Sequence, residues 1–161
     1  DIGAWVGTWT MAMNEFCGRV IAFEPDPVHY ECLVKNCPED VETHQLAIGN
    51  EEKMISLSED NFTQAKRVVG DGTIPMVTID SLNLDDVDLI KIDVEGFEME
   101  VLKGAENTLK NVDYLMIELN NNSKKYGSSN LEIEKYLGEM GFESMIKIWP
   151  DIVWRKKGER K

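Results

Sequence analysis

The chain has 161 residues, 42% of them apolar and 29% charged, which predicts one globular domain over residues 1–161 and excludes fibrous and disordered classes. The formal net charge is −13, and residues 1–154 alone carry 12 basic and 29 acidic side chains, or −17, because the tail 155–161 is basic. Such a surface repels phosphate backbones, so we expect no nucleic-acid partner, and no apolar run approaches the ~18 residues of a membrane span.

The first predicted elements alternate between helix and strand. A glycine-containing turn over residues 1–7 precedes a helix, whose predicted inner face has apolar residues at i, i+3, i+4 and i+7: Trp9, Ala12, Met13 and Phe16. Residues 19–23 predict a buried strand. Asp26 can cap the next helix, with Pro27 at its first position.

The middle of the chain continues this alternation with one interruption. Residues 41–48 predict a third strand, whereas residues 53–80 combine short β-prone runs with glycines and predict a β insertion or an irregular excursion. The run 87–94 has the strongest pattern of a buried strand, and a helix is expected from about Phe97.

The last third predicts a strand over 114–119, a helix opened by the capping box 129–132, and two strands over 142–148 and 152–155. Two strands joined so closely run antiparallel. The element order therefore predicts an α/β fold with a doubly wound, Rossmann-like sheet, mainly parallel and with an antiparallel strand at its C-terminal end.

The first seven residues form a D-x-G-x-x-x-G loop in front of a helix. Gly3 and Gly7 let the backbone turn tightly and let a ligand approach closely, and doubly wound folds bind ligands at the carboxyl ends of strands. The carboxylate of Asp1 suits the cationic amino group of an amino-acid-like cofactor. The loop differs from the G-x-G-x-x-G dinucleotide pattern, and taken alone it also fits a structural turn.

Glu24 ends the next strand, where an acidic side chain can accept hydrogen bonds from both hydroxyls of a ribose. The alternative is a carboxylate that stabilises the following helix N-terminus. The combination of Asp1, Gly3, Gly7 and Glu24 in this order favours a ligand site.

Acidic residues also leave the predicted central strand. Asp93 and Glu95 have i, i+2 spacing, so both side chains leave one face of an extended segment, at the sheet edge that carries the glycine loop. They could orient an acceptor hydroxyl, take its proton or hold a cation. The alternative is that Glu95 or Glu98 stabilises the next helix N-terminus.

Polar residues follow the next strand. Glu118 and Asn120 lie on the rim of the same inferred cleft, which predicts contact with a substrate, although a polar loop would look alike. His29 and His44 fall inside a predicted helix and a predicted strand, so we expect neither to be a catalytic base.

The cysteines at positions 17, 32 and 37 have neither metal-ligand spacing nor a disulfide framework, which favours a reducing compartment. With no signal peptide visible, we expect a cytoplasmic protein. The chain begins at Asp1, without Met and inside the glycine loop, so we expect natural sequence upstream.

The segments DIGAWVGTWT, VIAFEPDP, QLAIGN, TIDSL, DLIKIDVEGFEMEVLKGA and YLMIEL resemble the FkbM family of methyltransferases. The resemblance runs from Asp1 to about Leu119 and continues more weakly to Ile148. The run KIDVEGFE followed by VLKGA is its most specific part. Family members often have Asn where Trp5 stands.

The resemblance implies a class I methyltransferase sheet with an antiparallel last strand and S-adenosylmethionine as methyl donor. It also implies a buried strand immediately before Asp1, so that the first strand is truncated here. Carried over by position, Asp1 and Gly3 would line the methionine end of the cofactor, Glu24 would hold the ribose and Ala47 would lie by the adenine. Asp93 and Glu95 would face the methyl-transfer centre.

The resemblance further implies methyl transfer to a hydroxyl of a sugar, a glycolipid or a secondary metabolite, with Asp93 or Glu95 as the base. A non-catalytic or degenerate nucleotide-binding module of the same fold is an alternative. A nicotinamide-dependent oxidoreductase is another, which the missing G-x-G-x-x-G disfavours. We expect no bound metal, although Asp93, Glu95 and Glu118 could hold a divalent ion in a variant mechanism.

Overall fold

The structure is a computed structural model that describes residues 1–58, 66–120 and 122–158. The first half of the chain contains α1 (Thr8–Asn14), β1 (Ile21–Phe23), α2 (Pro27–Asn36), β2 (Glu42–His44), β3 (Ala47–Ile48), β4 (Lys53–Leu57) and β5 (Val68–Val77). The second half contains β6 (Leu89–Ile92), α3 (Glu98–Lys103), β7 (Tyr114–Glu118), α4 (Asn130–Glu139), β8 (Phe142–Ile148) and β9 (Asp151–Lys156). Short 3₁₀ helices connect some of these, at η1 (Asp80–Leu82), η2 (Thr108–Lys110) and η3 (Asn122–Tyr126).

The main sheet consists of two parts that meet at one residue. Strands β1 and β2 are parallel, and the other part has the order β6-β7-β9-β8, with β6 and β7 parallel and both β7-β9 and β8-β9 antiparallel. Ile2 bridges Phe23 of β1 and Ile92 of β6. The α/β class and the antiparallel C-terminal strands are confirmed, but the sheet is mixed rather than mainly parallel, because the terminal hairpin adds two antiparallel pairings.

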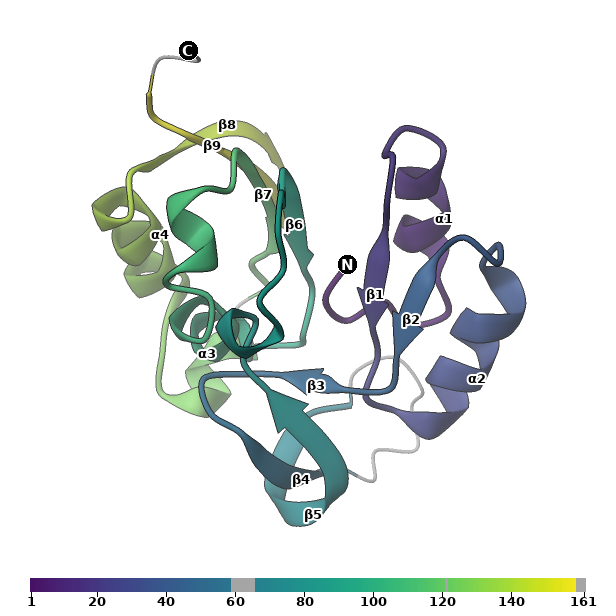
Figure 1. Ribbon diagram of the computed structural model, residues 1–161. Coiled ribbons are helices and arrows are strands. Elements are labelled where there is room, and N and C mark those ends of the chain that lie inside the picture. Colours follow the sequence, from purple (N-terminus) through teal and green to yellow (C-terminus); the bar gives the residue numbers. More distant parts are fainter. Residues whose placement is uncertain (59–65, 121, 159–161) are drawn as a thin grey trace.

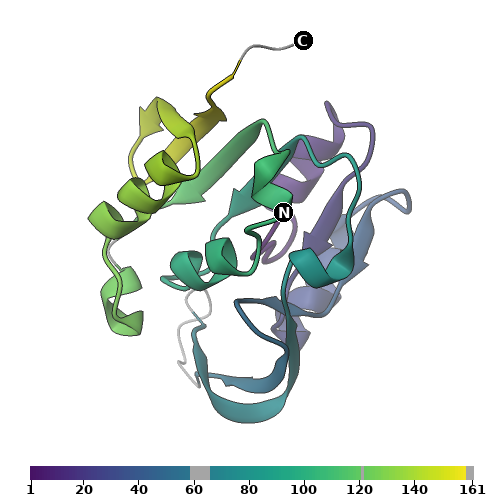
Figure 2. The ribbon, with the colours of Figure 1, turned by 60° about the vertical axis from the view of Figure 1, so that its left-hand side comes forward.

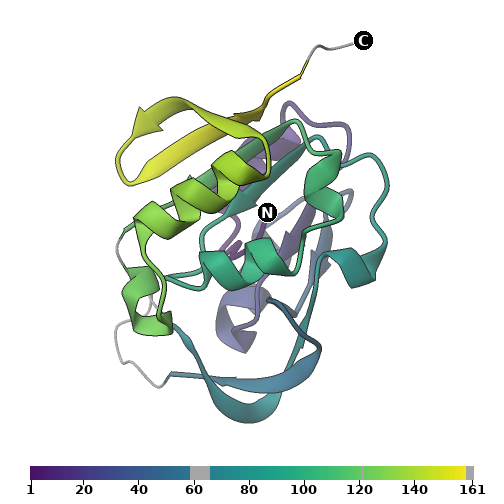
Figure 3. The ribbon, with the colours of Figure 1, turned by 90° about the vertical axis from the view of Figure 1, so that its left-hand side faces the viewer.

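Helices cover both faces of this sheet. In Figure 1, α1 and α2 lie beside β1 and β2, whereas α3 and α4 lie on the far side of β6 and β7. Figure 3 shows α3 and α4 in front of the sheet, with α2 behind it. Parallel strands need such crossover helices, and the helices bury the sheet faces on which they pack.

The main core lies between the sheet and the helices α3 and α4. Leu115 and Ile117 of β7 are fully buried, as are Ile133 and Leu137 on one face of α4. The neighbouring strand contributes Trp154, which pairs with Leu115 in the β7-β9 register. This layer holds β6 and β7 rigidly, so the residues that follow these strands are fixed in space.

Two predicted elements differ from the structure. The expected apolar face of the first helix is largely outside the core, since Trp9 is 43% and Phe16 85% exposed. Thr10 is buried there instead, because its hydroxyl donates to the Asp1 carboxylate at 2.6 Å. The run 41–48 forms two strands, since β2 pairs with β1 and β3 pairs with β5.

The predicted insertion is confirmed as β4 and β5, which are antiparallel, and residues 59–65 of it lie outside the described residues. With β3 they form a small sheet of order β3-β5-β4. Figure 2 shows this unit below the main sheet. Among the described residues, no helix has both the length and the apolar character that crossing a membrane requires. The strand expected before Asp1 lies outside this sequence and stays a prediction.

Candidate active site

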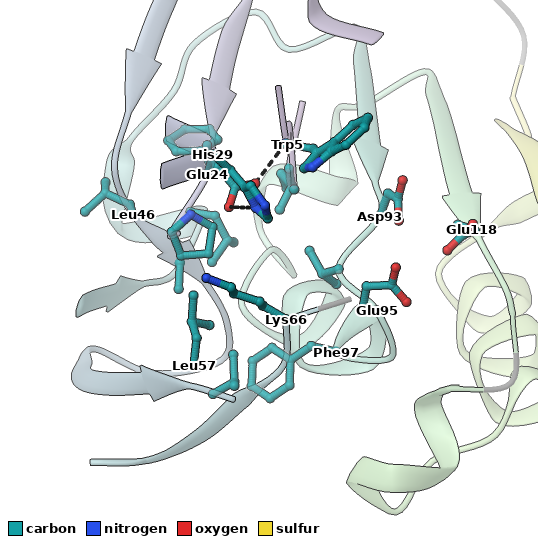
Figure 4. Close-up of a pocket in the computed structure, with 18 residues that line it drawn as sticks. Trp5, Glu24, His29, Leu46, Leu57, Lys66, Asp93, Glu95, Phe97 and Glu118 are labelled. Atoms are coloured by element: carbon teal, nitrogen blue, oxygen red, sulfur yellow. Dashed lines mark hydrogen bonds and ion pairs between the residues drawn. The ribbon is translucent and has the colours of Figure 1, made fainter. Parts of the chain in front are cut away.

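A cavity of about 260 Å³ lies where the glycine loop, β1, β3, β6 and β7 end. Figure 4 shows Glu24, His29 and Lys66 at one end of it and Asp93, Glu95 and Glu118 at the other. Trp5 lies above the space between them, and apolar side chains wall the rest: Leu46, Ala47, Leu57, Val68 and Phe97. The cavity therefore has one end of mixed charge around Glu24, one acidic end and an apolar wall.

The glycine loop packs tightly against the strand ends. Gly3 has a φ of +77°, and a Cβ there would lie 1.8 Å from the carbonyl oxygen of Asp93, so no other residue fits. The amides of Gly3 and Ala4 both donate to the carbonyl oxygen of Phe23, at 3.0 Å each. These contacts place the loop backbone directly beside the ends of β1 and β6.

Two of the predicted cofactor-binding residues do not line this cavity. The side chain of Asp1 is fully buried and accepts hydrogen bonds from Thr10 and from the ammonium of Lys91, at 2.6 and 3.0 Å. Gly7 has a φ of +92° and packs against Leu33. The structure gives both residues a role in shaping the loop, and their direct contact with a cofactor stays a prediction.

Lys91 is a functional candidate that sequence reasoning missed. It is 3% exposed on β6, and its ammonium lies 3.0 Å from Asp1 and 3.6 Å from Asp93. Burial lowers the pKa of Lys91, and the nearby negative charge of Asp93 opposes that shift. The sequence did contain a signal for this role, because Lys91 is a charged residue within a predicted buried strand. A buried charge needs a partner of opposite charge.

Glu24 occupies the place that the sequence predicts. It is 6% exposed, and its two carboxylate oxygens accept the backbone N–H of Trp5 at 2.8 Å and that of Asp26 at 2.9 Å. Each oxygen can accept a further hydrogen bond, so the side chain stays available to a ligand. Burial raises the pKa of Glu24 despite these hydrogen bonds. Ala47, also predicted, is buried on β3 and lines the cavity.

Three carboxyl groups meet at the other end. Asp93, Glu95 and Glu118 each bring an oxygen within 4.8 Å of the other two. The Asn120 amide connects them, because its Nδ2 donates to Glu118 at 2.7 Å and to Glu95 at 3.3 Å. Asn122 also donates to Glu95, at 2.9 Å. Asn120 thus holds two of the acids, although it does not itself line the cavity.

Burial and mutual repulsion shift the protonation of this trio. The pKa of Glu118 rises to about 8, first through burial and then through the charges of Asp93 and Glu95. Burial and the charge of Asp93 also raise the pKa of Glu95. The raised pKa favours the protonated form of Glu118, which can donate a hydrogen bond.

Glu98 lies in the first turn of α3, where the sequence predicts a carboxylate that stabilises the helix N-terminus. It is 1% exposed at the start of α3 and accepts the amide N–H of Gly96 at 2.8 Å. It fixes the turn after β6, where Glu95 has a φ of +55° and Gly96 one of +110°. This turn aims Glu95 at the cavity.

Comparison with known proteins identifies the fold and the family. Residues 1–144 match a family model described as "Methyltransferase FkbM domain". The chain belongs to the FkbM methyltransferase family. The crystal structure of a methyltransferase FkbM from Methylobacillus flagellatus superimposes with a TM-score of 0.67 at 19% identity, over 96% of this chain and 42% of that one.

Two curated relatives of this FkbM chain carry methyltransferase names. The hexuronic acid methyltransferase AglP of Haloferax volcanii is 29% identical over 130 residues, which are 74% of this chain and 54% of that protein. Methyltransferase 1 of Beauveria bassiana is 25% identical, over 83% of this chain and 69% of that protein. The chain thus spans about half the length of the first relative.

Proposed function

We propose that this FkbM methyltransferase uses S-adenosylmethionine to methylate a neutral hydroxyl of a sugar-like acceptor. The observation that carries the proposal is one cavity with Glu24 at one end and the trio of Asp93, Glu95 and Glu118 at the other. The family match and the curated methyltransferase relatives support it.

The first end of the cavity fits the adenosine part of the cofactor. Glu24 keeps acceptor capacity for ribose hydroxyls, while Leu57, Val68 and Phe97 provide an apolar wall against which a flat base can pack. Pockets that bind small molecules combine apolar walls with a few placed polar groups in this way. The β4-β5 insertion contributes two of these wall residues, which gives it a role in binding.

The second end fits the reacting groups. When bound, S-adenosylmethionine supplies a methyl group made electrophilic by the adjacent sulfonium. The residues of the chain hold the acceptor oxygen in line with that methyl group and receive the hydroxyl proton. Asp93 and Glu95 are the proposed proton acceptors, because the raised pKa of Glu118 favours the protonated form of that carboxyl. Glu118 then contacts the acceptor, and Asn120 holds Glu118 through its hydrogen bond.

The acidic trio also favours an uncharged acceptor group. Like charges in a partly buried site repel, so a carboxylate placed beside Asp93 and Glu95 would be disfavoured. A hydroxyl can instead donate to one carboxylate and accept from the protonated Glu118. AglP is named for a hexuronic acid, and a sugar is therefore the acceptor class that we propose, with methyl transfer to a hydroxyl.

Paired sugars test this proposal. We would incubate the protein with S-adenosylmethionine and either a neutral hexoside or the matching hexuronide, and measure the methylated sugar by mass spectrometry. Methylation of hydroxyl groups, faster on the neutral sugar, is expected. Methylation of the uronate carboxyl instead would overturn the acceptor assignment, and no methyl transfer to any acceptor would favour a non-catalytic binding module.

Two further measurements distinguish this function from an oxidoreductase and from a metal-dependent methyl transfer. Calorimetric titration with S-adenosylhomocysteine and with NAD separates a methyltransferase from an oxidoreductase, and binding of the first alone is expected. Assays with a chelator test the metal-dependent mechanism. We expect unchanged turnover, since the Asn120 amide already donates to Glu95 and Glu118 and offsets part of their repulsion without a cation.

A further inference from the structure

His29 is a buried side chain in the cavity that the proposed chemistry does not use. It lies in the first turn of α2, is 9% exposed and lines the cavity next to Glu24. Figure 4 shows its ring between Glu24 and the open space of the cavity. A histidine in this position can contact any ligand that reaches Glu24.

The backbone fixes this ring. Asp26 caps α2 by accepting the amide N–H groups of Val28 and His29, at 3.0 Å each, and Pro27 occupies the first helical position. The ring of Trp5 meets the imidazole edge-on, with centroids 6.3 Å apart and planes at 79°. Two elements, the glycine loop and α2, therefore hold the imidazole in place.

The ring nitrogens of His29 form no hydrogen bond with the part of the chain that the structure describes. The Nδ1 atom lies 3.8 Å from an oxygen of Glu24 and 3.7 Å from one of Asp26, beyond hydrogen-bond length. Neither ring nitrogen belongs to the buried, unpaired side-chain atoms of the described residues, so both can be reached by a ligand that enters the cavity. A ligand group can therefore serve as their hydrogen-bond partner.

We infer that His29 binds a ribose hydroxyl of the cofactor, next to the hydroxyl that Glu24 holds. The inference rests on the proposed function. A neutral imidazole offers one donor and one acceptor, whereas a carboxylate only accepts. A ribose diol has two hydroxyls, and each can donate and accept, so the pair of Glu24 and His29 matches it. The imidazole stands at the opposite end of the cavity from Asp93 and Glu95, and it serves binding rather than proton transfer.

Cofactor analogues provide the test. We would measure the dissociation constants of S-adenosylhomocysteine and of its 2′-deoxy and 3′-deoxy forms by calorimetry, for the wild type, His29→Ala and His29→Gln. We expect His29→Ala to bind S-adenosylhomocysteine about tenfold more weakly than the wild type. With the analogue that lacks the hydroxyl bound by His29, the variant and the wild type should have equal affinity. The Gln variant, which keeps a donor and an acceptor, should recover part of the affinity.

Each result of this titration has a distinct meaning. An equal loss for all three compounds would mean that His29 only supports the cavity wall, and an unchanged affinity would mean that it does not touch the cofactor. Either result overturns the inference while leaving the proposed function intact. No binding of S-adenosylhomocysteine to the wild type would instead remove the proposed function itself. Lys35→Ala, at an exposed position of the same helix, serves as the matched control and should bind all three compounds like the wild type.

Discussion

At the scale of single residues, Glu24 serves the protein and the ligand at once. Its carboxylate ties the glycine loop to the turn before α2, through the N–H groups of Trp5 and Asp26. A ligand that adds hydroxyl donors to the same oxygens would stabilise the charged form, which burial disfavours. Cofactor binding and loop order are therefore coupled at this side chain.

Replacing Glu24 by Gln should weaken cofactor binding. The variant keeps the size of the side chain but loses the charge and one acceptor oxygen, and hydrogen bonds to charged groups contribute about 1.5–3 kcal/mol. We expect the dissociation constant of S-adenosylhomocysteine, measured by calorimetry, to rise about 10- to 100-fold. Glu31→Gln on the exposed side of α2 is the control, and an equal affinity of both variants would contradict the role of Glu24.

Asp93→Asn should separate turnover from binding. The amide keeps the shape of the side chain but cannot take a proton from the acceptor, and general base catalysis contributes about 10²- to 10⁴-fold. We expect initial rates to fall within that range, while the affinity for S-adenosylhomocysteine changes less than about threefold. Unchanged turnover in this variant, with Glu95→Gln inactive, would move the base to Glu95.

Glu118 should make folding stability depend on pH. Its pKa is about 8 in the folded protein against an ordinary 4.5, so between these values the folded state keeps a proton that the unfolded state releases. Stability therefore falls as pH rises through this window. We expect the Tm of the wild type to decrease from pH 5 to 8, and Glu118→Gln to flatten that decrease.

The control for this measurement is Glu143→Gln. Glu143 is partly exposed, and the hydrogen bond from the Arg155 guanidinium lowers its pKa, so its titration falls below the window. The slope of Glu143→Gln should equal that of the wild type. An identical slope in Glu118→Gln would show that Glu118 is ionised at neutral pH.

The positions of the acidic residues around the cavity could be predicted from the sequence better than those of the neighbouring residues that lie beside them. Glu24, Asp93 and Glu95 follow strands and Glu118 ends one, and these strand ends meet in space, so the positions of the four acids could be predicted from element order. His29 could not, because a helix periodicity does not show which residue of the first turn faces a neighbouring loop.

At the scale of elements, Asp80 fixes the connection between the β insertion and the core. Its carboxylate accepts the N–H groups of Asn107 and Thr108 and the hydroxyl of Thr108, all at 2.8 Å. Partial burial alone would raise the pKa of Asp80, but these hydrogen bonds outweigh it and lower the pKa. The carboxylate thereby holds η1 against the start of η2.

Replacing Asp80 by Ala should destabilise the fold by about 1–3 kcal/mol, the cost of leaving such donors unsatisfied. Urea unfolding at pH 7 measures this difference, with Asp85→Ala in the neighbouring loop as the control. Because the folded-state pKa is depressed, the contribution is present above the ordinary pKa and is lost as pH falls through the folded value. An Asp80→Ala protein as stable as the control would contradict the role of this carboxylate.

The starts of helices could be predicted where the sequence contains a capping motif. Asp26 caps α2 and Ser129 caps α4, as their sequence motifs indicate. The division of 41–48 between two sheets was not predictable, because the apolar pattern of a strand does not say with which strand it pairs. The inner face of α1 was predicted wrongly, since a hydrogen bond of Thr10 decides the orientation of that helix.

At the scale of the whole molecule, the two parts of the main sheet depend on the segment at Asp1 and Ile2. Ile2 donates its N–H to the carbonyl oxygen of Lys91 and accepts the N–H of Asp93, at 2.9 and 3.0 Å. The neighbouring Asp1 carbonyl accepts the N–H of Phe23 at 2.9 Å. The Glu24 end of the cavity follows β1 and the acidic trio follows β6 and β7, so this segment sets the distance between the two ends.

Ile2→Ala should therefore affect stability and binding together. Ile2 is 2% exposed and belongs to the main core cluster, and the loss of such a side chain costs about 2–5 kcal/mol. We expect that loss in urea unfolding, together with weaker binding of S-adenosylhomocysteine, since the Glu24 end moves relative to the acidic end. Ile148→Ala, at a position that is 72% exposed, should change neither quantity. A destabilised Ile2→Ala protein that binds S-adenosylhomocysteine like the wild type would show that other contacts hold the two ends of the cavity in register.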